Sequence, residues 1–158
     1  MKKIPLTQGK YAIVDDEDYE VLNQFKWCAK KSNQTSYAIR GTGPRDNLKR
    51  LYMHSEILPQ PQGKEIDHRD GNGLNNTRSN LRFCTRQQNC ANKRTNNKKT
   101  SSQYKGVCFT DRAKPWLANI SFNNNTKFIG YFYSEINAAK AYDKKARDLF
   151  GEFANTNF

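Results

Sequence analysis

A polar, basic stretch near the middle of the chain limits what this sequence can fold into. The segment ANKRTNNKKTSSQ, residues 91–103, has no apolar side chain after Ala91 and no periodicity that would turn one face toward a core. A segment of this composition buries too little apolar surface to offset the entropy lost on ordering. We therefore expect the 158 residues to form small units on either side of a basic linker at residues 93–102.

The chain carries a large excess of positive charge. It has 27 Lys and Arg against 15 Asp and Glu, which gives a formal net charge of +12. This balance favours a polyanion as partner, with nucleic acid first and an anionic membrane second. No long apolar run supports the membrane, and the opening residues lack the apolar segment of a signal peptide. We expect a cytoplasmic location and no membrane association.

Residues 1–50 predict a small β-rich unit. Strand character at residues 9–14 is followed by an acidic run in which Asp15 or Asp16 could cap a short helix. A helix dipole favours carboxylates in the first turn, so capping explains this run better than a metal site does. Two more strand-like segments are expected beyond it, SYAIR and RLYMHSEIL.

Beyond the linker, the sequence predicts three strands and a helix. The strand patterns are YKGVCFT, PWLANISF and TKFIGYF, and the helical pattern is SEINAAKAYDKKARDLFG. In the middle strand Ala118 and Ile120 fall on one face and Asn119 on the other. Ser134 and Gly151 are expected at the two ends of the helix. The chain should therefore be an α+β protein whose C-terminal three-stranded antiparallel sheet packs on one helix.

One of the two histidines stands in the segment IDHRDGNGLNNTRSNLRFCTRQQN, residues 66–89. Either this is an exposed turn with an incidental histidine, or Asp67 and His68 belong to a metal-assisted acid–base site. Phosphodiester hydrolysis needs a base for water and a cation for the charge on phosphate. A histidine with a pKa of about 6.5 and a carboxylate that binds Mg²⁺ could supply both. An EF-hand is excluded because Gly71 and Arg78 stand where it needs oxygen ligands.

This segment resembles the HNH motif of phage and intron-type homing endonucleases, in which a β-hairpin and a helix hold one divalent ion. The match consists of DH, NN, NLR and N at the intervals found here, within a core at residues 51–92. The resemblance implies that Asp67 is a metal ligand, His68 the general base and Asn80 the residue that orients the histidine. It implies Asn89, on the helix that follows, as the second ligand. Such oxygen ligands favour one Mg²⁺ (or Mn²⁺) over zinc.

The remaining candidate ligands fit a metal site poorly. The four cysteines contain no CxxC pair, so packing is their expected role and a zinc site with the histidines is the weaker alternative. His54 matches the strand before the motif in that family. A structural or phosphate-binding role is expected for it.

Residues 103–158 resemble the APETALA-type DNA-binding domain of plant ethylene-response factors, which is also appended to phage homing endonucleases. The matches are YKGV, W-x-A-x-I, IGYF, AAKAYD and the ending GEFANTNF. In that family the exposed face of a three-stranded sheet enters the major groove. The resemblance implies DNA contacts from Lys105, Cys108, Arg112, Asn119, Ser121, Thr126, Phe128 and Tyr142. The cations expected to lie along phosphates in the linker are Lys93, Arg94, Lys98 and Lys99.

Together the motifs predict a site-directed DNA endonuclease of the homing type, from a bacterial or phage-infected cell. The expected partner is double-stranded DNA, and a monomer or weak dimer without an obligate protein partner is expected. One site per chain predicts one nicked strand per monomer. The alternative is a non-catalytic DNA-binding regulator with a degenerate HNH module. RNA binding is a third possibility, without an aromatic RNA-binding motif in its support.

Overall fold

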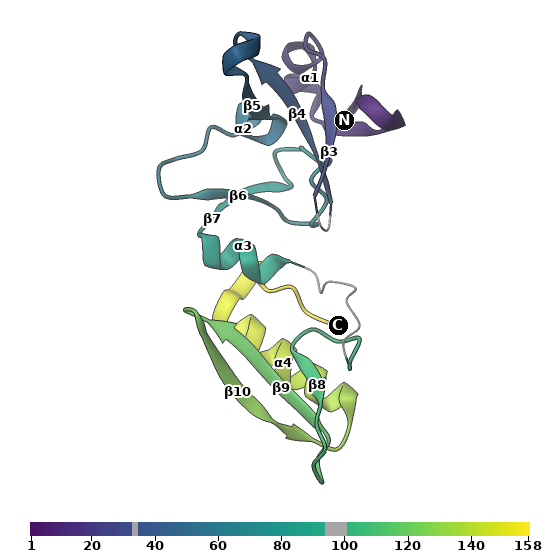
Figure 1. Ribbon diagram of the computed structural model, residues 1–158, viewed down its shortest axis with the longest axis vertical. Coiled ribbons are helices and arrows are strands. Elements are labelled where there is room, and N and C mark those ends of the chain that lie inside the picture. Colours follow the sequence, from purple (N-terminus) through teal and green to yellow (C-terminus); the bar gives the residue numbers. More distant parts are fainter. Residues whose placement is uncertain (33–34, 94–100) are drawn as a thin grey trace. The chain divides into compact units, whose positions relative to one another are not determined.

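A computed structural model describes residues 1–32, 35–93 and 101–158, and the chain divides into two compact units. The first spans Met1–Thr85 and the second Arg86–Phe158. Unit 1 contains small antiparallel sheets with short helices, and unit 2 contains one three-stranded antiparallel sheet with helices (Figure 1), so the α+β prediction is confirmed. Residues 94–100 of the predicted linker lie outside the described residues. Within the described part of the chain, none of the helices is long and apolar enough to cross a membrane.

Unit 1 begins with a hairpin and a short helix. Strand β1 (Lys2–Pro5) pairs antiparallel with β2 (Tyr11–Val14), with the 3-10 turn η1 (Thr7–Gly9) between them. Helix α1 (Asp16–Leu22) follows at the predicted place, with Asp15 at its N-cap position. The Asp15 side chain does not cap the helix. Its Oδ2 accepts a hydrogen bond from the backbone N–H of Arg78 at 2.7 Å instead.

A second sheet in unit 1 has the order β3-β4-β5. Its strands are β3 (Cys28–Lys31), β4 (Ser36–Thr42) and β5 (Lys49–Tyr52), with the 3-10 turn η2 (Arg45–Asn47) between the last two. The predicted strand RLYMHSEIL is wrong in its second half, because helix α2 (Met53–Ile57) replaces it. The helix buries Met53 and Ile57, four residues apart, against the core. Residues at this spacing share a face in a strand and in a helix alike, so the apolar pattern did not distinguish the two.

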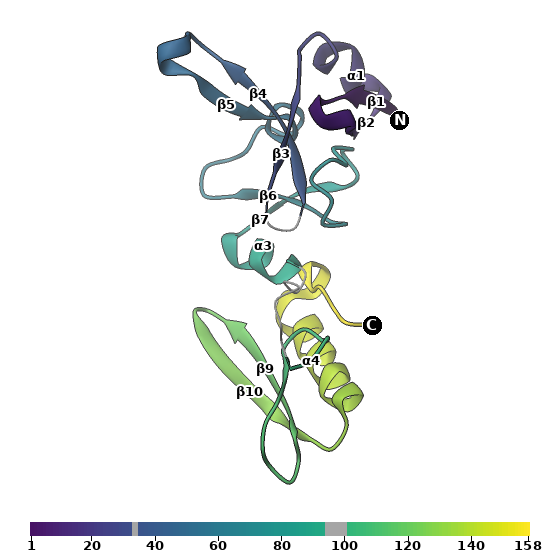
Figure 2. The same ribbon diagram turned by 45° about the vertical axis from the view of Figure 1, so that its right-hand side comes forward.

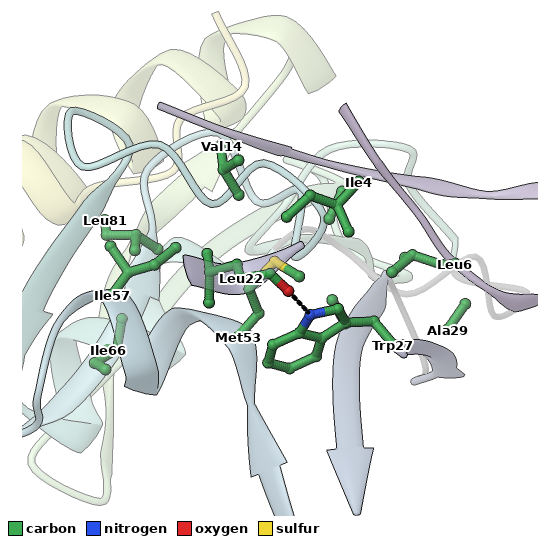
Figure 3. Close-up of a cluster of buried hydrophobic side chains, with 12 residues drawn as sticks. Ile4, Leu6, Val14, Leu22, Trp27, Ala29, Met53, Ile57, Ile66 and Leu81 are labelled. Carbon is green, nitrogen blue, oxygen red and sulfur yellow. Dashed lines mark hydrogen bonds between the residues drawn. The ribbon is translucent and has the colours of Figure 1, made fainter. Parts of the chain in front are cut away.

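The third sheet of unit 1 is the hairpin of β6 (Glu65–His68) and β7 (Leu81–Cys84). Its side chains Ile66 and Leu81 join the same core as Ile4, Val14 and Trp27 (Figure 3). The indole N–H of Trp27 donates to the carbonyl of Leu22 at 2.8 Å, which satisfies the one polar atom of that side chain inside the core. The motif hairpin therefore rests on the N-terminal strands.

Unit 2 has the predicted three strands and helix. After α3 (Arg86–Asn92) come β8 (Val107–Phe109), β9 (Trp116–Phe122), β10 (Asn125–Phe132), α4 (Glu135–Phe150) and the 3-10 turn η3 (Gly151–Phe153). The sheet order is β10-β9-β8, and Figure 2 shows α4 along one side of it. Ala118 and Ile120 are buried against Ala139 and Ala146 of the helix, as the period-two pattern predicted. Small side chains on both surfaces allow this close approach.

A buried carboxylate fixes the C-terminal segment of unit 2. Asp143, which is 2% exposed, accepts hydrogen bonds from the backbone N–H groups of Asn157 and Phe158 and from the Asn157 amide, all within 2.9 Å. The Asn157 amide oxygen accepts in turn from the backbone N–H of Lys105 at 2.7 Å. The start and the end of unit 2 are thereby joined through one helix residue.

Gly106 should be the most sensitive glycine of unit 2. It adopts a φ of +75°, and a Cβ there would collide with the ring of Tyr142 and lie 2.7 Å from the carbonyl oxygen of Asn119. We expect Gly106→Ala to lower the free energy of unfolding by about 2–4 kcal/mol, since overpacking adds to backbone strain. Urea unfolding followed by Trp116 fluorescence measures it.

Gly151→Ala is the matched control. Gly151 also has a positive φ, +53°, but nothing lies within 4 Å of its added Cβ. It should therefore lose only the backbone contribution, about 1 kcal/mol. Equal losses at the two glycines would contradict the packing argument.

Candidate functional site

The hairpin β6–β7 carries the central residues of the motif. Its register pairs Asp67 with Arg82 and His68 with Leu81. Asp67 and His68 end strand β6, and both are only 5% exposed. Burial of an acid and a base side by side is costly unless each has a polar partner, so the partners define the site.

Asp67 is held by a buried ion pair across the hairpin. The guanidinium of Arg82 donates from Nε at 2.9 Å and approaches with Nη2 at 2.8 Å, both to Oδ2 of Asp67. The two side chains are each 6% exposed. A fork of two donors on one carboxylate fixes its orientation and offsets its desolvation. Asp67, the predicted metal ligand, is therefore an oriented carboxylate.

His68 is held by an asparagine. Its Nε2 lies 3.2 Å from Oδ1 of Asn76, a side chain that is fully buried. An amide oxygen can only accept, so Nε2 carries the hydrogen and the lone pair stands on Nδ1. Burial lowers the pKa of His68 below 6.5, against the opposing effects of Asn76, Asp70 and Asp67. His68 is thus a neutral base at physiological pH, with Nδ1 as its basic atom.

Backbone hydrogen bonds with strand β2 position Asn76. Its N–H donates to the carbonyl of Ile13 at 2.8 Å, and the N–H of Ile13 donates to the carbonyl of Leu74 at 2.8 Å. Strand β2 therefore pairs with this loop through its backbone. Among the described residues, Nδ2 of Asn76 is buried without a hydrogen-bond partner. Such an atom costs about 1–3 kcal/mol, so the contact with His68, more than stability, explains this side chain.

Asn80 ties the loop together. Its Nδ2 donates to Oδ1 of Asp70 at 3.0 Å and to the carbonyl of Asn75 at 2.7 Å, while its Oδ1 accepts from the backbone N–H of Asp70 at 3.1 Å. The sequence reading gave Asn80 the task of orienting the histidine. In the structure Asn76 contacts the ring nitrogen Nε2 of His68.

A cation next to Asn80 anchors the same loop to helix α1. The guanidinium of Arg78 pairs with Asp18 and Glu17 at 2.7 Å each, in addition to the backbone contact with Asp15. The acidic run after Val14 therefore has a partner 60 residues away in the chain. Local sequence reasoning explained these acids by the helix dipole alone.

Two aromatic rings contact His68, and a third stacks on one of them. The rings of His54 and His68 lie 5.2 Å apart at 79°, and that of Tyr37 lies 5.8 Å from each histidine. Tyr52 stacks on His54 at 5.2 Å and 24°. Both histidines of the chain thus meet in one cluster. Burial, with His68 nearby, lowers the pKa of His54 from 6.5 to about 4.

The oxygen donors present suit the ion that the motif implies. Asp67 offers a carboxylate, and Asn89, half-buried on α3 of unit 2, offers an amide; its role as a ligand stays a prediction. Carboxylate and amide oxygens are ligands for Mg²⁺ and Mn²⁺. No group of three or more His, Cys, Asp or Glu gathers among the residues that the structure describes.

Several predicted DNA contacts of unit 2 gather in two places. Lys105, Asn119, Ser121 and Tyr142 line one groove of about 720 Å³. On the sheet, the exposed ring of Phe128 lies 5.2 Å from that of Tyr131, and the guanidinium of Arg112 lies 4.9 Å from the same ring. Cys108 is half-buried and Thr126 exposed, and Lys93 is exposed. Arg94, Lys98 and Lys99 lie outside the described residues.

Two of these residues have other partners or little free surface. Nζ of Lys105 donates to the carbonyls of Ala91 and Lys93 at 2.6 and 2.7 Å, at the C-terminal end of α3. A cation is favoured there by the helix dipole and the unsatisfied carbonyls. Tyr142 is 5% exposed, and burial raises its pKa to about 12. DNA contacts from both residues remain predictions. The contact that the structure shows for Lys105 is with the carbonyls at the end of α3.

The low pKa of His54 makes the stability of unit 1 depend on pH. The unfolded chain binds a proton at His54 as the pH falls from 6.5 toward 4, while the folded chain does not. The contribution of His54 to the free energy of unfolding is therefore fully present above pH 6.5 and is lost as the pH falls toward 4. This loss is on the order of 3 kcal/mol. Urea unfolding at several pH values, followed by Trp27 fluorescence in a Trp116→Phe background, measures the slope.

His54→Phe is the comparison for this measurement. It removes the titrating group and keeps an aromatic ring, so unfolding should depend less steeply on pH between 4.5 and 6.5, a window set by the two pKa values. His68 contributes in the same direction and should leave a residual slope. Equal slopes in the two proteins would show that His54 titrates normally.

Comparison with known proteins agrees with the motif. The family model described as HNH endonuclease matches residues 59–91, which include β6, β7 and most of α3. An uncharacterised HNH endonuclease of Acanthamoeba polyphaga mimivirus is 34% identical over 151 residues, which cover 95% of this chain and 76% of that protein. No solved structure matches the chain. The similarity over nearly its whole length, together with the Asp67–His68 hairpin, shows that the chain belongs to the HNH endonuclease family.

Proposed function

We propose that this protein is a site-directed DNA endonuclease of the homing type, in which His68 is the general base. The observation that carries the proposal is the contact of His68 Nε2 with Asn76, next to the oriented carboxylate of Asp67. This arrangement leaves Nδ1 as the basic atom of a neutral imidazole. A base of this kind can take the proton of a water molecule that attacks a phosphodiester.

The remaining residues have supporting roles in the proposed reaction. Asp67 and Asn89 would hold one divalent ion, Mg²⁺ or Mn²⁺, which when bound supplies positive charge for the phosphate and the leaving oxygen. Arg82 keeps Asp67 oriented, and Asn80 keeps the loop that carries Asn76 closed. His68 passes its proton to solvent after each cycle. Each chain carries one such site, which can act on one phosphate, so one monomer should nick one strand.

We assign target affinity to unit 2. Its three-stranded sheet on α4 supports the APETALA-type resemblance, in which the exposed sheet face enters the major groove of double-stranded DNA. Exposed Arg112 and Phe128, with the half-buried ring of Tyr131 between them, combine a cation with aromatic surface on that sheet. A guanidinium and aromatic rings can contact phosphate, sugar and base edges. Asn119 and Ser121, on the strand beside them, add hydrogen-bonding groups.

A non-catalytic DNA-binding regulator is the second candidate. The observation in its favour is that Arg82 already occupies Oδ2 of Asp67 in a buried ion pair. In a regulator this pair would close the hairpin in place of a metal ion. Titration with Mg²⁺ separates the two functions, because a regulator produces no metal-dependent strand scission at any concentration.

Removal of His68 should abolish nicking without abolishing binding. We expect wild-type protein with Mg²⁺ to convert supercoiled plasmid to the open circle, and His68→Ala to do so about 100- to 10,000-fold more slowly, because the general base is lost. Gel electrophoresis of the plasmid measures the rate, and gel shift measures DNA affinity. Equal rates for the two proteins would refute the assignment.

Asn76→Ala should lower the nicking rate by about 2- to 10-fold, the contribution of one hydrogen bond that holds the imidazole. Ser79→Ala is the matched control, because Ser79 lies exposed in the same loop. It should stay within about twofold of wild type. A full rate for Asn76→Ala, with DNA affinity unchanged, would remove Asn76 from the site.

Asn76→Asp extends this test through pH. It keeps an oxygen acceptor for Nε2 but adds a negative charge beside the ring, which raises the pKa of His68. The acidic limb of the rate profile should therefore move to higher pH than in the wild type. An unchanged profile would show that the residue does not face the imidazole in solution.

A further inference from the structure

The proposed reaction uses His68 and leaves the second histidine of the chain without a role. His54 is the first-turn residue of α2 and lies in unit 1, like the motif hairpin. The two imidazole rings meet edge to face, with centroids 5.2 Å apart and an interplanar angle of 79°. Edge-to-face contact is the favoured geometry of aromatic pairs, because the positive edge of one ring meets the negative face of the other.

Tyr37 completes the aromatic wall beside His68. Its ring contacts His68 at 5.8 Å and 56° and His54 at 5.8 Å and 76°. Tyr37 is itself fixed by the motif loop, since a Cβ on Gly73 would stand 2.5 Å from its ring and 2.6 Å from the carbonyl of Ser36. Only glycine allows the loop to approach this closely. The loop and the wall are therefore packed against each other.

The far side of His54 is fixed as well. Tyr52 stacks on it at 24°, and Nζ of Lys30 donates to the Tyr52 hydroxyl at 2.9 Å. Tyr37 also meets Tyr52 edge to face at 6.0 Å. Strands β3, β4 and β5 thus each supply a side chain to the arrangement. His54 has a defined ring plane before any substrate is present.

These aromatic contacts restrain the plane of the His68 ring. The contact of Nε2 with Asn76 positions one atom of that ring, and the packed rings act on its orientation about that contact. Rings on the face and edge of the imidazole restrict its rotation. A general base must hold its lone pair within about 10–20° of the productive direction, so the restriction bears on rate.

We propose that His54 is a positioning residue for His68, and that its ring, together with Tyr37, holds the plane of the His68 imidazole so that Nδ1 keeps one direction. The inference rests on the proposed function for its effect on catalysis. Of the two roles expected from sequence, structural or phosphate-binding, it specifies the structural one and differs from phosphate binding. A positioning ring acts through shape alone, whereas a phosphate ligand acts through a hydrogen-bonding nitrogen.

His54→Phe and His54→Ala separate these two roles in plasmid nicking by the full chain. Phenylalanine keeps the ring, so kcat and KM should stay within about twofold of wild type. Alanine removes it and should lower kcat by about two- to tenfold, the equivalent of one aromatic pair, with KM and the Mg²⁺ midpoint unchanged. Tyr11→Ala, an exposed aromatic of unit 1, is the control and should match wild type.

Two results would overturn the proposal. A loss in His54→Phe as large as that in His54→Ala, or a raised KM in both, would show that a nitrogen of His54 is needed. Full activity in His54→Ala would show that the ring is dispensable. If the alanine variant does not fold by Trp27 fluorescence, His54→Leu replaces it, since it fills the space without an aromatic ring.

Nitrogen NMR of the imidazoles tests positioning without relying on nicking. The chain has only two histidines, so His54→Phe protein labelled with ¹⁵N-histidine reports His68 alone. At pH 8 all three proteins should keep the hydrogen on Nε2, because the contact with Asn76 selects the tautomer, whereas relaxation should show faster internal motion of the His68 ring in His54→Ala than in wild type and His54→Phe. Equal ring motion in the three proteins would overturn the proposal. If wild type does not nick DNA, the proposed function fails while this measurement still decides the role of His54.

Discussion

Two backbone hydrogen bonds between strand β2 and the motif loop hold the candidate site together. The N–H of Ile13 donates to Leu74 and the carbonyl of Ile13 accepts from Asn76, at 2.8 Å each. Backbone contacts of this kind set the position of the loop regardless of its side chains. Because Asn76 is delivered this way, its amide reaches Nε2 of His68 and selects the tautomer. Without β2 the loop would lose these two backbone anchors, and Oδ1 of Asn76 would no longer be held in place as a hydrogen-bond acceptor for His68.

It follows that the N-terminal strands are part of the site and not only a scaffold beside it. Hairpin β1–β2 supplies the loop anchor, α1 supplies the acids that hold Arg78, and the sheet β3-β4-β5 supplies Tyr37 and Tyr52. All of them share one hydrophobic core with the motif hairpin. Because a protein core is close-packed, a shift in one of these strands displaces its neighbours and changes the position of the His68 imidazole.

Sequence reasoning predicted the local features well, because they have local causes. The alternating faces of β9 and the helix ending at Gly151 follow from periodicity and turn chemistry within a few residues, and the hairpin at Asp67–His68 was implied by the resemblance to the HNH motif. The segment at His54 was misassigned, because the spacing of Met53 and Ile57 fits one face of a strand as well as one face of a helix. The contacts of Asn76 and His54 with His68 were not predicted. Their partners lie 8 and 14 positions away in sequence, and packing alone brings them together.

Sequence reasoning overestimated the positive charge that is available to bind DNA. Residues 71–110 contain eight basic side chains and no acid, which predicts a surface for a polyanion. Three of these cations have partners inside the protein: Arg78 on the acids of α1, Arg82 on Asp67, and Lys105 on the carbonyls that end α3. Burial lowers the pKa of Lys105 to about 8, which is the electrostatic cost of that position. An ammonium cannot bind phosphate and close a helix with the same hydrogen atoms. The positive charge that residues 71–110 offer to DNA is therefore smaller than their composition suggests, and recognition by unit 2 must depend more on shape and on aromatic and amide groups such as Phe128 and Asn119.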